Sequence, residues 1–216
     1  AIWRLWGEKG GPMPSQFAGH SLGEWSALVC AGSLDFADAV KIVRSRGAYM
    51  QQAVPVGEGA MAAILGIADD IIIAACDSAR ESGVVNAVNF NAPGQVVIAG
   101  STAGVDRAIT ICKEAGAKRA MALPVSAPFH TSLMRPAAEQ LAELVQATSF
   151  VSPTIPVIHN VTAQTEADPK IIKSLMLEQI YKPVMWVDCI LALKAAGAEQ
   201  FVECGPGRVL NGLTKR

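Results

Sequence analysis

The sequence lacks long hydrophobic runs and has no marked excess of charge of either sign. Although 51% of the 216 residues are hydrophobic, no stretch reaches the about eighteen consecutive apolar residues of a membrane-spanning helix. Charged residues make up only 17% and the formal net charge is −1, so neither nucleic acid nor an anionic membrane is an expected partner. No apolar export signal with a small-residue cleavage site is visible at the start, so we expect a cytoplasmic protein.

Cysteine and histidine are also scarce. The five cysteines are scattered, with no CxxC pair and no histidine at the spacing of a zinc site. We therefore expect free thiols in a reducing compartment and no metal site. Only three histidines are available, His20, His130 and His159, which narrows the choice of a catalytic base.

Short apolar runs alternate with segments of helical period, and Gly or Pro separates them, which is typical of an α/β protein. We predict a hydrolase-like parallel-sheet large lobe formed by residues 1–54 and 127–216, with an inserted ferredoxin-like small lobe at residues 55–126. The small lobe is expected to run strand 60–65, helix 69–81, strands 84–89 and 95–99, helix 102–115 and strand 118–125.

The large lobe is predicted from the same signals. Ser33 is expected to cap a long helix that ends near residue 52. The other expected elements are helices 2–9, 22–31, 134–148, 169–181 and 187–196, and strands 16–19, 155–160 and 200–204.

The segment Gly19-His20-Ser21-Leu22-Gly23 matches the GxSxG pattern of a nucleophile elbow. Its glycines permit a tight turn and close approach of neighbouring backbone. The helix that follows would direct free N–H groups and positive partial charge at a developing oxyanion. Five residues alone are a weak signal, but a strand before the motif and a helix after it favour Ser21 as an acyl-carrying nucleophile over a turn serine.

A serine nucleophile needs a general base. His20 adjoins Ser21, and adjacent side chains on an extended segment point apart, so it is expected to support the site. His159 lies in an apolar run, where a core or sheet-end histidine is the commoner outcome. By elimination the base is His130, in a loop from which it can reach a cleft; the alternative is a solvated loop histidine.

Arg46 falls on a helix face that should point inward. An inward guanidinium needs an anion, because an unpaired buried charge costs several kcal/mol. A structural Asp or Glu and a substrate carboxylate held by a bidentate pair are equally compatible with this position. The residues sharing the face are Phe36, Ala39, Val43, Arg46 and Met50.

Several motifs in one order resemble the malonyl-CoA:acyl-carrier-protein transacylases of bacterial fatty-acid synthesis, over nearly the whole chain. The matching stretches are Gly19–Glu24, Arg46-Gly47, Gly59–Ala63, Val88–Gly100, Pro124–His130, Gln179, Pro183-Val184, Trp186 and Gly205–Gly207.

The resemblance implies a ping-pong reaction in which malonyl-CoA acylates Ser21 and the phosphopantetheine thiol of acyl carrier protein then takes the malonyl group. It implies that His130 is the general acid/base and that Arg46 binds the malonyl carboxylate. No cofactor is implied, since the CoA thioester is a substrate. The other implied substrate-site residues are Gln179, which would orient the histidine, Leu22, whose N–H would line the oxyanion hole, and Asn89, Asn91, His20, Phe129 and Met50.

The family opens with a strand ending in Gly-Gln-Gly-Ser-Gln, whose first Gln supplies a second oxyanion donor. We expect that this chain begins downstream of that motif and stops before the family's C-terminal helix. Loss of an oxyanion donor typically costs about 10²–10³ in rate. Two alternatives remain: a serine esterase or thioesterase that uses the same Ser21 and His130 but passes the acyl group to water, and an inactive truncated fragment that binds carrier protein, which only the missing motif favours. An esterase for neutral esters has no use for an inward Arg46.

Acyl carrier proteins are acidic, so basic residues near the cleft would steer their approach. The candidates are Lys118, Arg119, Lys215 and Arg216, with ordinary solvated surface charge as the alternative. We expect the protein to be a monomer.

Overall fold

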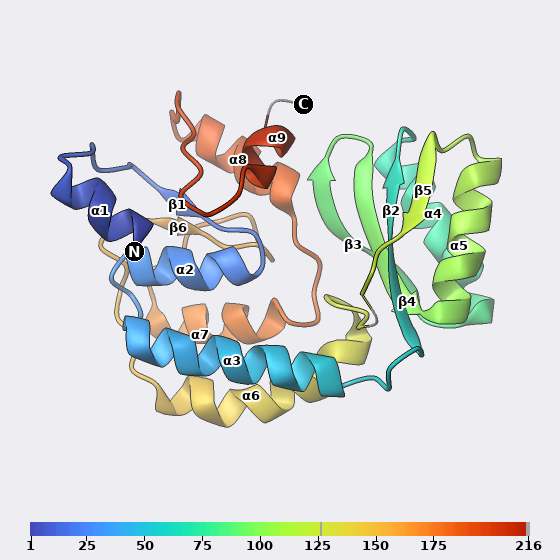
Figure 1. Ribbon diagram of the computed structural model, residues 1–216, viewed down its shortest axis with the longest axis horizontal. Helices are drawn as coiled ribbons and strands as arrows, with labels where there is room; N and C mark the ends of the chain where they lie inside the picture. Colours follow the sequence, from blue (N-terminus) through green and yellow to red (C-terminus); the bar gives the residue numbers. More distant parts are fainter. Residues whose placement is uncertain (126, 215–216) are drawn as a thin grey trace.

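The computed structural model describes residues 1–125 and 127–214, which form two sheets with their own helices (Figure 1). One sheet is parallel and pairs β1 (Phe17–Ala18) with β6 (Val157–Ile158). The other is antiparallel and has the strand order β3-β4-β2-β5. The predicted α/β class is confirmed, and we call the two regions the parallel part and the antiparallel part.

The antiparallel part follows the predicted order of strand, helix, two strands, helix and strand. Its sheet order is that of the split βαβ arrangement, so residues distant in sequence become neighbours in the sheet. One sheet face packs against both helices, through a core that includes Ile64, Ile72, Ile98 and Val105. The elements are β2 (Gly59–Leu65), α4 (Asp69–Ala79), β3 (Val85–Ala92), β4 (Gln95–Ser101), α5 (Thr102–Glu114) and β5 (Arg119–Ala122).

The parallel part is built largely from helices packed around the elbow. Its core includes Trp25, Leu28, Ile42, Leu141 and Met176, all nearly or fully buried. The helices are α1 (Ile2–Glu8), α2 (Leu22–Cys30), α3 (Phe36–Gln52), α6 (Arg135–Ala147), α7 (Pro169–Glu178), α8 (Trp186–Ala195) and α9 (Val209–Leu213). Within the described residues, no helix combines the length and the apolar character needed to cross a membrane.

The two parts are joined by backbone hydrogen bonds as well as by side-chain packing. Val184 donates its N–H to the Val88 carbonyl at 2.8 Å and accepts from the Phe90 N–H at 3.0 Å, so β3 is the strand nearest the parallel part. Phe129 packs against the core of the parallel part and against the second face of the antiparallel sheet. The predicted lobe boundary at 126/127 involves Ser126, which lies outside the described residues.

Two local predictions are wrong. The cap of α3 is Asp35, whose carboxylate accepts from Ala37 N and Asp38 N at 2.8 and 3.3 Å, whereas the buried Ser33 donates its hydroxyl to the Val151 carbonyl. A carboxylate adjacent to the first helical residue fits both the geometry and the helix dipole better than a serine two residues earlier.

The predicted strand 200–204 is irregular in the structure. Val202 is exposed, and no neighbouring strand pairs with this segment among the residues described. A short apolar run can form a strand only where a partner offers hydrogen bonds, and the sequence pattern cannot supply that partner.

Candidate active site

Ser21 lies at the turn between β1 and α2, in a backbone conformation that side-chain-bearing residues rarely adopt, with φ 51° and ψ −103°. Gly19 makes this turn possible: a Cβ on Gly19 would come within 2.1 Å of the Gly23 carbonyl group. At Gly23 a Cβ would meet nothing within 4 Å. The first glycine of the motif is therefore required by close packing, and the second is not.

His130 is the histidine that contacts the nucleophile. Its Nε2 lies 2.9 Å from Ser21 Oγ, and its Nδ1 lies 2.7 Å from the main-chain oxygen of Gln179. A carbonyl oxygen can only accept, so Nδ1 carries the proton and Nε2 is free to accept from the serine hydroxyl. Burial, and after it the positive charge of Arg46, lowers the pKa of His130 to about 3. The imidazole is thus neutral and oriented as a base.

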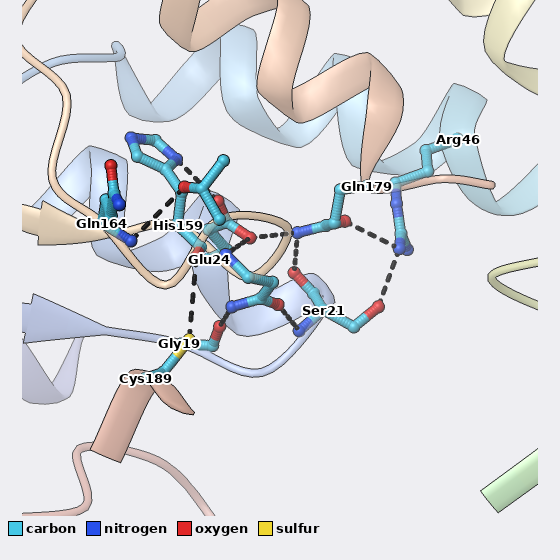
Figure 2. A network of polar contacts seen from close by, with 10 residues as sticks. Gly19, Ser21, Glu24, Arg46, His159, Gln164, Gln179 and Cys189 are labelled. Carbon is cyan, nitrogen blue, oxygen red and sulfur yellow. Dashed lines mark hydrogen bonds and ion pairs between the residues drawn. The ribbon is translucent and has the colours of Figure 1, made fainter. Parts of the chain in front are cut away.

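Arg46, on α3, also reaches the nucleophile. Its Nη2 donates to Ser21 Oγ at 2.8 Å and to Gln179 Oε1 at 3.2 Å (Figure 2). The side chain is buried, and burial lowers its pKa to about 10 against the opposing attraction of Glu24. No carboxylate forms an ion pair with Arg46 in the described part of the chain. A structural Asp or Glu in direct contact therefore does not explain why Arg46 points inward.

Gln179 connects the three groups. Its main-chain oxygen holds His130, its Oε1 accepts from Arg46, and its Nε2 donates to the Ser21 carbonyl at 2.9 Å. Nε2 also donates to Glu24 Oε2 at 2.6 Å (Figure 2). Because the histidine is held by the main chain, the Gln179 side chain is free to link the arginine with the nucleophile's backbone.

Asn160 is a site residue that sequence reasoning missed. Its Oδ1 accepts from the Ser21 N–H at 2.7 Å, and its Nδ2 donates to the Gly19 carbonyl at 2.7 Å. The side chain is 0% exposed. A usable signal did exist: Asn160 follows β6, and the carboxyl ends of adjacent parallel strands meet at one edge of a sheet.

Glu24 and His159 form a buried pair behind the elbow. Glu24 Oε1 lies 2.7 Å from His159 Nδ1, and its Oε2 accepts from the Asn160 N–H at 3.2 Å as well as from Gln179. The expectation of a core histidine at 159 agrees with its 0% exposure. The pair anchors the residues that touch Ser21.

The remaining residues implied for the substrate site fall into two groups. His20 Nε2 lies 2.8 Å from Asn91 Oδ1, so the residue before the nucleophile contacts β3, and burial lowers its pKa. Leu22 begins α2 and is 53% exposed; as the first helical residue its N–H has no intrahelical acceptor. Asn89, also on β3, is buried and its Nδ2 lacks a described hydrogen-bond partner.

Phe129 and Met50 have packing roles. Phe129 is half-buried between the two parts, next to His130. Met50 is only 3% exposed and lies in the core of the parallel part, and its place in the substrate site stays a prediction.

Of the four proposed docking residues, the structure describes Lys118 and Arg119, and it does not bring these two to the site. Lys118 and Arg119 are exposed at the start of β5, and β5 is at the opposite edge of the sheet from β3 (Figure 1). Lys215 and Arg216 lie outside the described residues.

Comparisons of the sequence and of the structure with known proteins find acyltransferases. The acyl transferase domain family matches residues 1–215. The malonyl CoA-acyl carrier protein transacylase of Escherichia coli (strain K12) is 53% identical over 216 residues, which are 100% of this chain and 70% of that protein.

Two solved structures are similar over the whole chain. The acyl carrier protein S-malonyltransferase from Vibrio cholerae is 54% identical with a TM-score of 0.98, covering 100% of this chain and 70% of that one. A malonyl-transacylase in complex with its type II PKS acyl-carrier protein is 50% identical with a TM-score of 0.98 and the same coverage.

Proposed function

Because this chain belongs to the acyl transferase domain family, we propose that it moves a malonyl group from malonyl-CoA to the phosphopantetheine thiol of acyl carrier protein, through a malonyl ester of Ser21. The observation that carries the proposal is the convergence on Ser21 Oγ of a base, His130 Nε2 at 2.9 Å, and a cation, Arg46 Nη2 at 2.8 Å. The base suits acyl transfer, and the buried cation suits an acyl group with a free carboxylate.

In the first half-reaction, Ser21 Oγ attacks the thioester carbonyl carbon while its proton passes to His130 Nε2. The carbonyl oxygen becomes an oxyanion, to which the Leu22 N–H at the start of α2 donates. The carbon–sulfur bond then breaks, the His130 proton goes to the departing sulfur, and CoA leaves as the thiol. The enzyme retains a malonyl ester.

The second half-reaction reverses these roles. The carrier-protein thiol gives its proton to His130 and attacks the ester carbonyl carbon. The bond from carbon to Ser21 Oγ breaks, and Oγ takes the proton back from His130. The product is a malonyl thioester on the carrier protein, an extender unit for fatty-acid synthesis.

Arg46 argues against hydrolysis of neutral esters as the main activity. An esterase that shared Ser21 and His130 would bury the guanidinium against an uncharged acyl group, and no anion would offset the cost of desolvating it. A malonyl carboxylate pairs with it instead. We also propose that the enzyme is cytoplasmic, where a reducing environment suits the five free cysteines, and that it is a monomer.

Intact-mass measurement after mixing with malonyl-CoA tests the proposal. We expect one malonyl adduct on the wild-type chain and none on Ser21→Ala. A folded wild-type chain that remains unmodified would contradict the proposed function.

A further inference from the structure

The hydroxyl of Ser21 is hydrogen-bonded on both sides in the free site. An arginine N–H can only donate, so the contact from Arg46 Nη2 occupies a lone pair of Oγ, and the hydroxyl proton is left for His130 Nε2. The contact involves a cation, and such hydrogen bonds are stronger than neutral ones. The atom that must attack the thioester is therefore also the acceptor of a buried positive charge.

This contact restrains the nucleophile in two ways. Donation by Arg46 withdraws electron density from the lone pairs of Ser21 Oγ, which makes the oxygen less ready to attack carbon. The same positive charge also lowers the pKa of His130 beyond what burial does, so the base accepts the hydroxyl proton less readily. Both effects are strengthened because Arg46 and His130 are buried, while Ser21 is half-buried.

Among the described residues, Arg46 nevertheless donates hydrogen bonds only to neutral groups, and the carboxylate of Glu24 attracts it without a direct contact. Its two described acceptors are the Ser21 hydroxyl and the Gln179 amide oxygen, which is the longer contact at 3.2 Å (Figure 2). Its buried Nε has no described hydrogen-bond partner. A carboxylate is a stronger acceptor than a hydroxyl and can take two guanidinium N–H groups at once. An arriving carboxylate can therefore draw the guanidinium from Ser21.

We propose that Arg46 makes the nucleophile dependent on the substrate: it restrains Ser21 Oγ in the free enzyme, and the carboxylate of the incoming acyl group releases that oxygen by taking over the guanidinium. The inference rests on the proposed malonyl transfer and adds that the carboxylate accelerates the acylation step as well as binding. An acyl group without a carboxylate meets a nucleophile that is still restrained.

The experiment supplies the carboxylate separately from the acyl group. Acetyl-CoA provides the acyl carbonyl, and sodium formate provides a carboxylate small enough to share the site. Single-turnover acetyl loading of Ser21 is followed by intact mass at saturating acetyl-CoA, with ionic strength held constant. We expect formate to raise the maximal loading rate by about tenfold in a saturable manner, in proportion to the restored base strength. Formamide, its neutral counterpart, should have no effect.

Two variants locate the effect. Arg46→Ala should load acetyl about tenfold faster than wild type without formate, through a higher maximal rate rather than a lower KM, and should not respond to formate. Arg44→Ala, at an exposed position on the same helix, is the matched control and should respond to formate as wild type does.

Inhibition of malonyl loading by formate shows that formate binds at Arg46. If formate inhibits malonyl loading in this way but slows acetyl loading or leaves it unchanged, the release role is overturned. It is equally overturned if Arg46→Ala loads acetyl no faster than wild type at saturation. Malonyl loading of the wild-type chain is measured in parallel. If the malonyl adduct forms but formate does not accelerate acetyl loading, only the release role of Arg46 is contradicted. If no malonyl adduct forms, the proposed function itself is contradicted.

Discussion

The side-chain amide of Asn160 bonds to both peptide groups that flank His20, accepting from the Ser21 N–H at 2.7 Å and donating to the Gly19 carbonyl at 2.7 Å. It thereby holds the turn that keeps Ser21 at a positive φ of 51°. The nucleophile is thus positioned by a residue from the end of the neighbouring strand, in addition to its own motif.

Asn160→Leu is expected to lower kcat for malonyl loading by about 10², because a small displacement of a reacting group has an effect of that size. KM for malonyl-CoA should change little, since Asn160 touches only the elbow backbone and Glu24 among the site residues. Steady-state kinetics of the folded variant measure this. Asn211→Leu, on α9, is the control; a kcat equal to that of wild type in Asn160→Leu would exclude the positioning role.

The two glycines of the elbow are expected to respond differently to alanine. Gly19→Ala forces a Cβ against the Gly23 carbonyl and should lower the melting temperature severely or prevent folding. Gly23→Ala places its Cβ in open space on the first turn of α2 and should be neutral or stabilising by up to about 1 kcal/mol. Thermal unfolding of the two variants checks this, and equal destabilisation would contradict the geometry.

Gln179→Ala should keep the shape of the pH–rate profile, because His130 is held by the main-chain oxygen and that contact remains. The loss of its side chain leaves Glu24 and Arg46 short of a partner, which should lower the free energy of unfolding by about 1–3 kcal/mol. Urea unfolding and a pH series of kcat/KM measure the two effects. A displaced pH profile would show that the side chain, too, governs His130.

The stability of the protein should depend on pH through His130. Burial holds its folded pKa at about 3, below the ordinary value of 6.5, so the unfolded chain binds more protons between these values. The contribution is fully present above about pH 6.5 and is lost progressively as the pH falls towards 3. His20, whose pKa burial also lowers, acts in the same direction.

Denaturant unfolding at about pH 7.5 and about pH 5 should therefore show a larger loss of stability in wild type than in His130→Asn. Equal losses in the two proteins would contradict a depressed pKa of His130.

The sequence predicted those parts of the site that depend on a local motif or on the small number of residues of one type. Ser21 lies in a five-residue motif between a strand and a helix, and His130 was chosen from only three histidines. The inward position of Arg46 followed from the spacing of apolar residues on α3, and its buried state agrees with that expectation.

Contacts made through the sheet could not be predicted in the same way. Asn160 and Glu24 meet across 136 residues of sequence, and only the parallel pairing of β1 with β6 brings them together. The wrong prediction of a strand at residues 200–204 has the same cause, because the fold, and not the local sequence, decides whether a neighbouring strand is available for pairing. Arg46 illustrates it too: its burial was predictable, but its contact with Ser21 Oγ was not.

Transfer from the isolated acyl-enzyme tests the central claim most directly. The malonyl adduct of the wild-type chain is freed of CoA and mixed with acyl carrier protein bearing phosphopantetheine, and both proteins are weighed by intact mass over time. We predict that the malonyl group leaves Ser21 and appears on the carrier protein in equal amount, while carrier protein lacking phosphopantetheine gains nothing. An adduct that persists, or that is lost to water without labelling the carrier, would contradict the proposed transfer.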